Sequence, residues 1–232
     1  MINNFLAVEQ KELWDNVLSQ STPSDTIVLQ FLVGKLDLDF LSANYQSDAQ
    51  EKIITVLTNS LLSTSITTIR SLLRVAPSTN EATAANIPQF SNFATAAIYL
   101  PELLLGSRKP LTNRELGYSL FSETKTDGAA EKYGQNHANF AMQLGLAALA
   151  TVDRKKVYCP TPLTGKYCQL EQDKKIELLQ RLCFRIPIIQ IAIKHCSATD
   201  AIDECMQKAL AQTTYLRRRS NVLEVLAFAL GE

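Results

Sequence analysis

The hydrophobic pattern of the first third of the chain predicts helices. Within residues 5–18 the apolar side chains fall at positions 5, 6, 13, 14, 17 and 18, and within 48–62 they fall at 53, 54, 57, 61 and 62. Apolar residues spaced by three or four predict the buried face of an amphipathic helix, and residues 65–75 continue the pattern. The continuous apolar run in 26–33 predicts either a helix or a buried strand, because so short a run has no diagnostic period.

A small and polar stretch at 76–87 interrupts this pattern. Ala, Ser, Thr and Asn dominate it, and it contains Pro77. Such a composition predicts a loop or linker. We therefore expect a helical N-terminal region over residues 1–80 and a second domain over residues 87–232.

The stretch from 111 to 170 predicts two helices followed by a β-hairpin. Thr112 and Glu115 have the spacing of a capping box, in which each side chain satisfies a backbone N–H at the start of a helix. The expected elements are a helix at 115–121, a polar turn at 122–128, a longer helix at 129–146, and strands at 149–152 and 156–159 around Asp153-Arg154-Lys155. This order predicts a winged helix-turn-helix, a fold that places one helix in a nucleic-acid groove but also serves protein–protein contacts.

Further helices are expected on both sides of this unit. Residues 88–105 predict its first helix, interrupted before Pro101 and ended by Gly106. Helices are also expected near 163–184, 186–195, 199–211 and 213–230, the last with an apolar stripe at Val222, Leu223, Val225, Leu226 and Phe228. The predicted fold class is mainly α, with a helical N-terminal region, a winged helix carrying a small hairpin wing, and C-terminal helices.

Composition and charge are those of a soluble globular protein with an uneven charge distribution. The 232 residues are 46% hydrophobic and 20% charged, with net charge zero. Residues 1–107 carry 5 Lys or Arg and 10 Asp or Glu, whereas residues 108–232 carry 18 and 13. The basic second half indicates an anionic partner, although scattered charges also serve solvation alone.

Cysteine usage and the N-terminus indicate a cytoplasmic protein. The five cysteines form no CxxC pair, and an odd number favours free thiols in a reducing compartment. The first residues lack the basic and apolar regions of a secretion signal, and no apolar run is long enough to predict a membrane span.

The helix at 129–146 contains the strongest candidate binding residues. Tyr133, Phe140, Ala141 and Leu144 share helical spacing and are expected to face the core, which leaves a polar face on the other side. Asn and Gln bind adenine edges in a bidentate manner, and Lys reaches guanine or phosphate. The candidate DNA-reading residues are Lys132, Gln135, Asn136 and Asn139.

Two basic segments are candidates for phosphate contacts. Arg154, Lys155 and Lys156 cluster at the tip of the predicted wing, where they would neutralise phosphates or enter the minor groove. Of the three arginines at 217–219, Arg217 and Arg218 are the candidates to reach phosphate. The remaining one is expected to pair with an acid such as Glu204 or Glu224.

No motif in the sequence predicts catalysis, a metal or a cofactor. Cys159, Cys168, His195 and Cys196 lack the short paired spacings of zinc sites, so buried free cysteines are expected. A restriction-type nuclease needs a Pro-Asp followed by Asp/Glu-x-Lys on adjacent strands. Only the second half occurs, at 9–11, 123–125 and 173–175. No phosphate-binding glycine motif and no nucleophile partner for a histidine is evident.

The arrangement from Ile87 to Leu230 resembles a winged-helix module that accompanies some bacterial restriction-modification enzymes. The resemblance is carried by Gly145-Leu146, by Thr161-Pro-Leu-Thr-Gly165, and by Thr213-Thr214 followed by Arg217-Arg218. The chain departs from the module's pattern at Leu226 or Phe228, where the module usually has Trp, and at Pro160. The resemblance implies DNA recognition in a restriction-modification or regulatory setting, without implying a catalytic site.

Three functions therefore remain open. The first is non-enzymatic binding of double-stranded DNA, as the recognition part of a restriction-modification system or as a transcription regulator. The second is a protein-interaction or oligomerisation module, which the zero net charge favours. The third is a type II restriction endonuclease whose carboxylates converge only in three dimensions. The expected partners are double-stranded DNA and a second copy or a partner protein of a restriction system, with the C-terminal apolar stripe as either dimer contact or core.

Overall fold

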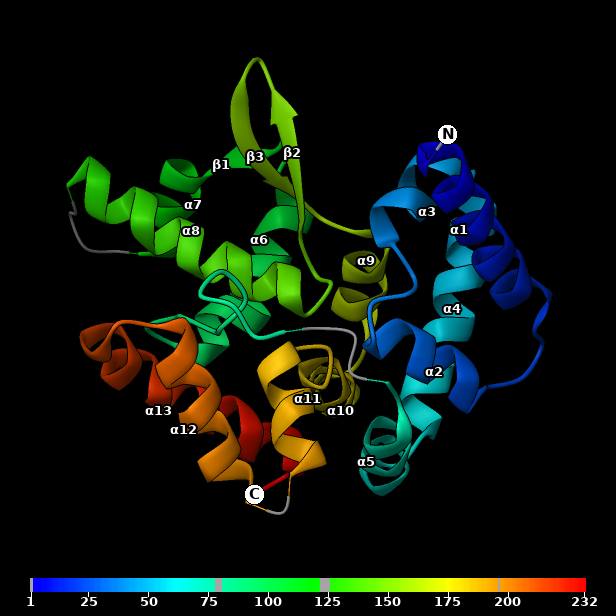
Figure 1. Cartoon of the computed structure of the whole chain (residues 1–232). Coiled ribbons are helices and arrows are strands. Elements are labelled where there is room, and N and C mark those ends of the chain that lie inside the picture. The colour runs from blue at the N-terminus through cyan, green and yellow to red at the C-terminus, as the bar shows by residue number, and fades with distance from the viewer. Residues whose placement is uncertain (1, 78–80, 122–125, 196) are drawn as a thin grey trace.

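The computed structural model describes residues 2–77, 81–121, 126–195 and 197–232. Over these residues the chain forms thirteen α-helices, one π-helical segment and a three-stranded antiparallel sheet. Figure 1 shows the helices packed around a common centre, with the hairpin of strands β2 and β3 projecting away from them. None of the described helices combines the length and hydropathy needed to cross a bilayer.

The N-terminal region is helical throughout, as the apolar pattern predicts. Its helices are α1 (Ile2–Ser19), α2 (Asp25–Leu32), α3 (Leu38–Asn44), α4 (Ser47–Ser63) and α5 (Ile66–Val75). The ambiguous apolar run is therefore a helix, α2. Helix α3 is absent from the prediction because its seven residues are too few to show a period. It begins where Asp37 accepts hydrogen bonds from the backbone N–H groups of Asp39 and Phe40.

The middle of the chain alternates short helices with short strands. The order is π-helix η1 (Thr95–Tyr99), α6 (Leu100–Gly106), β1 (Leu111–Thr112), α7 (Asn113–Leu120), α8 (Asp127–Gln143), β2 (Ala148–Val152) and β3 (Lys155–Cys159). The helix expected to begin at Pro88 is wrong in its first part, because residues 88–92 are not helical. The expected end at Gly106 is confirmed.

The expected interruption before Pro101 takes the form of the π-helical segment. Pro101 has no N–H, so the carbonyl oxygen of Ala97 loses its helical donor. The hydroxyl of Tyr167 donates to that oxygen at 3.2 Å. The buried carbonyl is thereby satisfied, and η1 and α6 are fixed against the C-terminal helices.

The sheet has the order β1–β3–β2, with β3 antiparallel to both neighbours. Strand β1 was not predicted, since two residues carry no strand pattern. The hairpin turn is one residue shorter than predicted, and Val152 pairs directly with Lys155. Asp153 and Arg154 have φ of 49° and 63°, as a two-residue hairpin turn of type I′ requires.

The C-terminal helices close the core. They are α9 (Pro162–Gln169), α10 (Gln172–Cys183), α11 (Pro187–Lys194), α12 (Ala198–Ala209) and α13 (Gln212–Leu230). The single helix expected at 163–184 is wrong, because the chain breaks between α9 and α10. Most of the apolar stripe of α13 packs inside the chain: Val222, Val225 and Leu226 are buried, whereas Leu223 and Phe228 are half-buried. The stripe is therefore mainly core.

One hydrophobic cluster joins the two predicted domains. Phe31 and Leu57 from the N-terminal helices lie in the same buried cluster as Phe140, Phe184 and Val222. The predicted boundary near residue 80 falls in a stretch without regular helix or strand where the structure describes it. The division into 1–80 and 87–232 stays a prediction.

Candidate functional site

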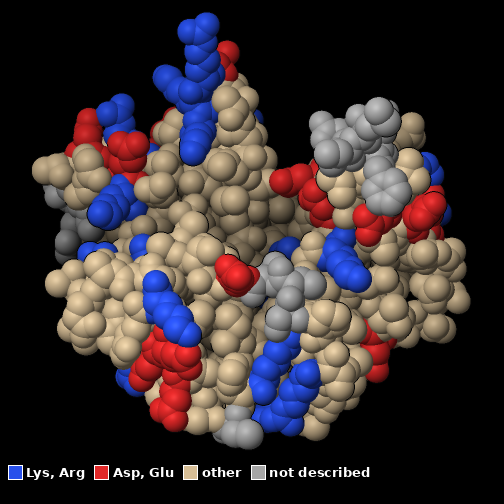
Figure 2. Space-filling model, in the orientation of Figure 1, with Lys and Arg blue, Asp and Glu red and all other residues tan. Residues whose placement is uncertain are grey.

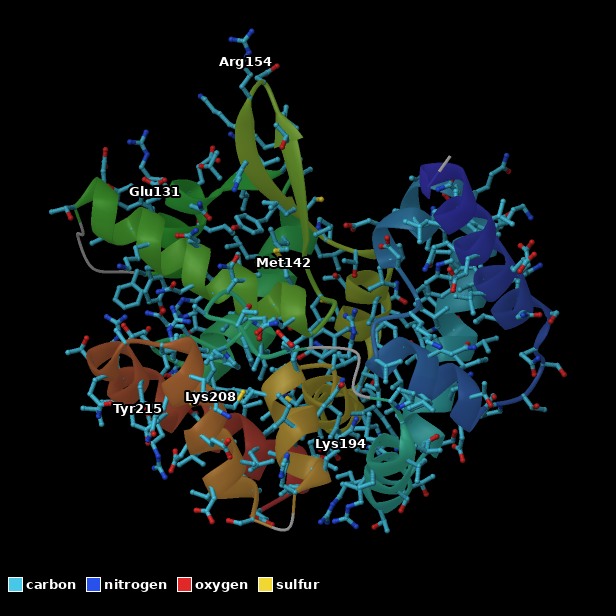
Figure 3. The ribbon with its side chains drawn as sticks, viewed as in Figure 1. Glu131, Met142, Arg154, Lys194, Lys208 and Tyr215 are labelled. Atoms are coloured by element: carbon cyan, nitrogen blue, oxygen red, sulfur yellow. The ribbon has the colours of Figure 1, made fainter. Side chains whose placement is uncertain are left out.

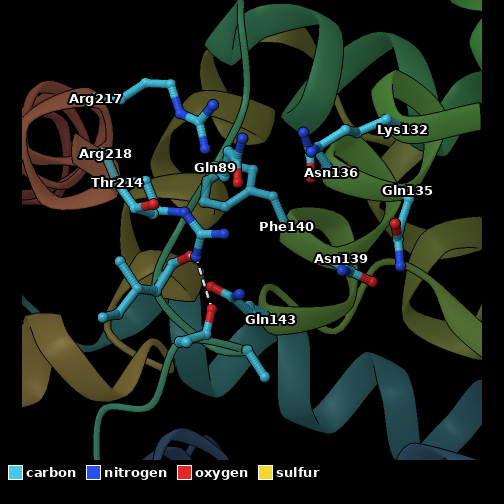
Figure 4. Close-up of a pocket in the computed structure, with 13 residues that line it drawn as sticks. Gln89, Lys132, Gln135, Asn136, Asn139, Phe140, Gln143, Thr214, Arg217 and Arg218 are labelled. Carbon is cyan, nitrogen blue, oxygen red and sulfur yellow. Dashed lines mark hydrogen bonds between the residues drawn. The ribbon is translucent and has the colours of Figure 1, made fainter. Parts of the chain in front are cut away.

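Six of the nine predicted binding residues line one cleft between α8 and the first turns of α13 (Figure 4). The cleft has a volume of about 380 Å³. The six are Lys132, Gln135, Asn136, Asn139, Arg217 and Arg218. Residues about eighty positions apart in the sequence thus contribute to a single surface.

Helix α8 is held so that its polar face turns outward. Its N-cap is Thr126, whose hydroxyl accepts from the N–H of Ala129 at 3.4 Å. On its inner face Phe140, Ala141 and Leu144 are fully buried, as predicted, and Tyr133 is half-buried. Phe140 packs against the ring of Phe90 with centroids 4.8 Å apart.

Two glycines allow α7 and α8 to cross at close range. A Cβ on Gly134 would lie 1.9 Å from the carbonyl oxygen of Asn113, and one on Gly117 would lie 1.9 Å from that of Ala130. Helix α7 begins with the predicted capping box, which is confirmed: Thr112 and Glu115 exchange side-chain to backbone hydrogen bonds. These contacts fix the angle at which α8 presents its outer face.

The amide side chains of α8 differ in exposure. Lys132 and Gln135 are exposed, whereas Asn136 and Asn139 are half-buried. Asn139 accepts a long hydrogen bond of 3.5 Å from the hydroxyl of Tyr158 on β3. No residue from 2–77 lines the cleft, so the acidic N-terminal region leaves this face open.

The opposite wall combines α13 with the segment 84–89. Arg218 donates from Nη1 to the carbonyl oxygens of Ala84 and Ile87, at 2.6 and 3.3 Å. Burial lowers the pKa of Arg218, and the charge of Arg217 lowers it further. Arg218 therefore shapes the cleft by holding its wall, whereas Arg217 makes no hydrogen bond or ion pair within the described chain and projects toward α8 (Figure 4).

The third arginine of this run is structural. Arg219 forms a bidentate ion pair with Asp203, with contacts of 2.7 and 3.1 Å, and this hydrogen bonding raises the pKa of Arg219. The expected pairing of one arginine with an acid is confirmed, but the acid is Asp203 and not either suggested example, Glu204 or Glu224; Glu204 pairs with Lys208. Asp203 lies one residue earlier on the same helix.

The cleft is positively charged although the whole protein is neutral. Three of its lining residues are cationic, and none is Asp or Glu. Two glutamines that sequence reasoning missed, Gln89 and Gln143, add further amides to the lining. Gln143 lies seven residues after Asn136 on the same helical face and was predictable from that spacing. Gln89 has no local signal, because only long-range packing brings it here.

The remaining three predicted residues lie on the hairpin, outside the cleft. Figure 3 shows Arg154 at the far tip, and Figure 2 shows Lys and Arg side chains gathered along the hairpin. Lys155 and Lys156 line a second hollow of about 530 Å³ together with residues of α7 and with Glu131 of α8. Helix α8 thus borders both hollows, through Glu131 here and through Lys132, Gln135, Asn136 and Asn139 in the cleft.

The predicted nuclease tripeptides and cysteines do not converge in the described chain. Residues 9–11 belong to α1 and residues 173–175 to α10, so neither tripeptide lies on a strand. No group of three His, Cys, Asp or Glu side chains that would suit a metal occurs among the described residues. Cys159, Cys168, Cys183 and Cys205 are free thiols. The predicted candidates at 123–125 and Cys196 lie outside the described residues.

No protein-family model, curated protein or solved structure matches this chain. Function must therefore be argued from the chemistry of the site.

Proposed function

We propose that this protein binds double-stranded DNA without enzymatic activity, as a winged helix. The element order α6, β1, α7, α8, β2, β3 and the sheet order β1–β3–β2 support this fold, in which α7 and α8 form the helix-turn-helix. In such a fold the second helix of the pair enters the major groove. That helix is α8.

The observation that carries the proposal is an outward amide-rich helix face with cations on both sides. Gln135 is exposed near the middle of α8, and Asn139 follows one turn later. An α-helix fits the roughly 12 Å width of the major groove, where Gln and Asn form paired hydrogen bonds with adenine. The proposal assigns base reading to these amides together with Lys132 and Asn136.

The flanking cations have the complementary task of binding phosphates. Arg154, Lys155 and Lys156 project on the hairpin on one side of α8, and Arg217 projects from α13 on the other. Contacts to phosphate fix the register of a protein on DNA and carry no sequence information. Arg218 is assigned a supporting role, since its Nη1 is bound to carbonyl oxygens.

The resemblance to modules of restriction-modification enzymes supports a role as the recognition part of such a system, with a transcription regulator as the other setting. A second copy of the chain or a partner protein of that system would then complete the assembly. Any such dimer would find little free surface on the apolar stripe of α13, because Val222, Val225 and Leu226 are buried and Leu223 and Phe228 are half-buried.

The proposal is tested by selecting duplexes from a random library with the purified protein. We expect a defined site to be enriched, and Gln135→Ala to bind that site roughly 5- to 150-fold more weakly, the range for loss of one bidentate base contact. Gln207→Ala, an exposed change on α12, is the matched control and should bind normally. Failure to bind any duplex would refute the proposal.

A further inference from the structure

We propose that the cleft between α8 and α13 holds a single nucleobase rotated out of the DNA stack. This inference rests on the proposed function and deepens it. The cleft has a volume of about 380 Å³, at the small end of the roughly 300–1,000 Å³ range of ligand pockets. The four residues of α8 assigned to base reading all line this cleft, so the polar face of α8 forms one of its walls. A hollow of this size suits one planar base.

The lining of the cleft suits the edge of a base. The Oε1 atom of Gln143 is buried without a hydrogen-bond partner among the described residues, and so is the Nε atom of Arg218. Buried polar atoms without partners are uncommon and need an explanation, such as an ordered water or a ligand. Both side chains line the cleft, and Figure 4 shows them next to each other. The two atoms have almost no exposed area, so each side chain must rotate toward the cleft before it offers its acceptor or its donor to a base.

Every nucleobase carries a hydrogen-bond donor and an acceptor that complement the acceptor of Gln143 and the donor of Arg218. The Watson–Crick edges of all four bases present at least one donor next to one acceptor, and proteins that extrude a base read it by this edge. The amides of Gln89 and Asn136 also line the cleft and can serve either role. The lining thus matches a neutral polar heterocycle, and the absence of carboxylates among its residues leaves it compatible with the nearby phosphates.

In this cleft an arginine, and not an aromatic ring, is available to stack on a base. Phe140 lines the cleft but is fully buried, and its ring packs against Phe90 and Phe93. The exposed guanidinium of Arg217 is planar and stands at the rim (Figure 4). Guanidinium planes stack on unstacked bases and also bind phosphate. Arg217 is positioned to cover a base held against the amides of α8.

The test uses 2-aminopurine, whose fluorescence rises when it leaves the base stack. The probe replaces each base of the selected duplex in turn, and emission is measured with saturating protein. We expect a several-fold increase at one position. Gln143→Met, which keeps the side-chain volume and removes the amide, should lose most of this increase while retaining duplex binding. Gln207→Met is the matched control and should behave as the native protein.

Two further measurements use the native protein, so they do not depend on a variant that folds. They distinguish a base extruded from a duplex from a base of single-stranded DNA. With the native protein, a mismatch at the responding position should tighten binding roughly tenfold, because extrusion costs less from a weakened pair. Single-stranded DNA carrying the probe should bind more weakly than the duplex. Tighter binding to the single strand would overturn extrusion from a duplex. Saturated duplex binding without fluorescence change at any position would overturn this inference alone, and absence of DNA binding would overturn the proposed function with it.

Discussion

Arg218 donates a hydrogen bond of 2.6 Å to the carbonyl oxygen of Ala84, which lies 134 residues earlier in the chain. This contact fastens the segment before η1 to the first turns of α13 and so builds one wall of the cleft. Its neighbour Arg217 is exposed and lines the same cleft. Adjacent arginines therefore differ in their contacts: Arg218 holds the wall of the cleft through Nη1, which leaves its Nε for the proposed base, whereas Arg217 makes no hydrogen bond or ion pair within the described chain.

The same substitution should therefore affect different properties at the two positions. Arg218→Gln should lower the free energy of unfolding by about 1.5–3 kcal/mol, the usual contribution of a charged hydrogen bond. Arg217→Gln should change stability by less than about 0.5 kcal/mol but reduce the salt dependence of DNA binding by about one phosphate contact. Urea unfolding and DNA titration of both variants measure the two effects. Equal losses of stability would contradict the assignment.

The close crossing of α7 and α8 makes Gly134 irreplaceable. Its added Cβ would meet the carbonyl oxygen of Asn113 at 1.9 Å, and backbone cannot move aside cheaply. Gly134→Ala should therefore destabilise the protein by about 3 kcal/mol or more. Gly128 in the first turn of the same helix has no atom within 4 Å of the added Cβ, so Gly128→Ala is the control and should be neutral or slightly stabilising. Thermal unfolding of both variants decides the point.

The capping box gives stability a defined pH dependence. Hydrogen bonds from Lys109 and then from Thr112 lower the pKa of Glu115 from 4.5 to about 2. The stabilisation is present above pH 4.5 and is lost as pH falls toward 2, because the carboxylate must then be protonated. Since the side chain is 39% exposed, solvent screening limits the effect to about 1 kcal/mol or less.

Glu115→Gln is the variant that tests this dependence. It should unfold at a lower temperature than the native protein at pH 7, and the difference should shrink between pH 4.5 and pH 2. Calorimetry of both proteins over this range is the measurement. A difference that persisted unchanged at pH 2 would show that the carboxylate charge is not responsible.

A substitution in the hairpin turn should change stability and DNA binding in opposite directions. Arg154 has φ of 63°, a conformation that costs a residue with a side chain about 1–2 kcal/mol and costs glycine much less. Arg154→Gly should thus stabilise the protein by about 0.5–1 kcal/mol after the entropy of the unfolded glycine is counted. The same change removes a cation and should weaken DNA binding. A variant that is both less stable and equally good at binding would contradict this account of the tip.

Local patterns in the sequence predicted most of the helices and the hairpin. The capping box at Thr112 and the apolar spacing through Phe140 and Leu144 were sufficient to orient α8. Two elements were missed because they are too short to show a repeating pattern, namely the seven-residue helix α3 and the two-residue strand β1. The helix break between α9 and α10 was also missed, because the segment 170–171 contains neither glycine nor proline.

The candidate site was predictable in its residue types and not in its shape. The polar Lys, Asn and Gln residues on one helix face follow from helical spacing, although Asn136 and Asn139 are half-buried, and the turn with Arg154 follows from the strand patterns on either side of it. The cleft itself depends on Arg218 and on Gln89, which line it together with α8 although they lie far from α8 in the sequence, and on the long-range bond from Arg218 to Ala84. Such contacts leave no local signal, since each partner looks like an ordinary surface residue in its own segment.

The central claim, that the amide face of α8 meets DNA between two sets of cations, is tested most directly by the salt dependence of duplex binding. Affinity of the native protein for its selected duplex should fall steeply with salt, because each phosphate contact contributes about 0.9 to the slope of log K against log salt concentration. Replacing Arg154, Lys155 and Lys156 together by Gln should make that slope shallower by about three contacts. An unchanged slope, or no measurable binding at low salt, would contradict the account.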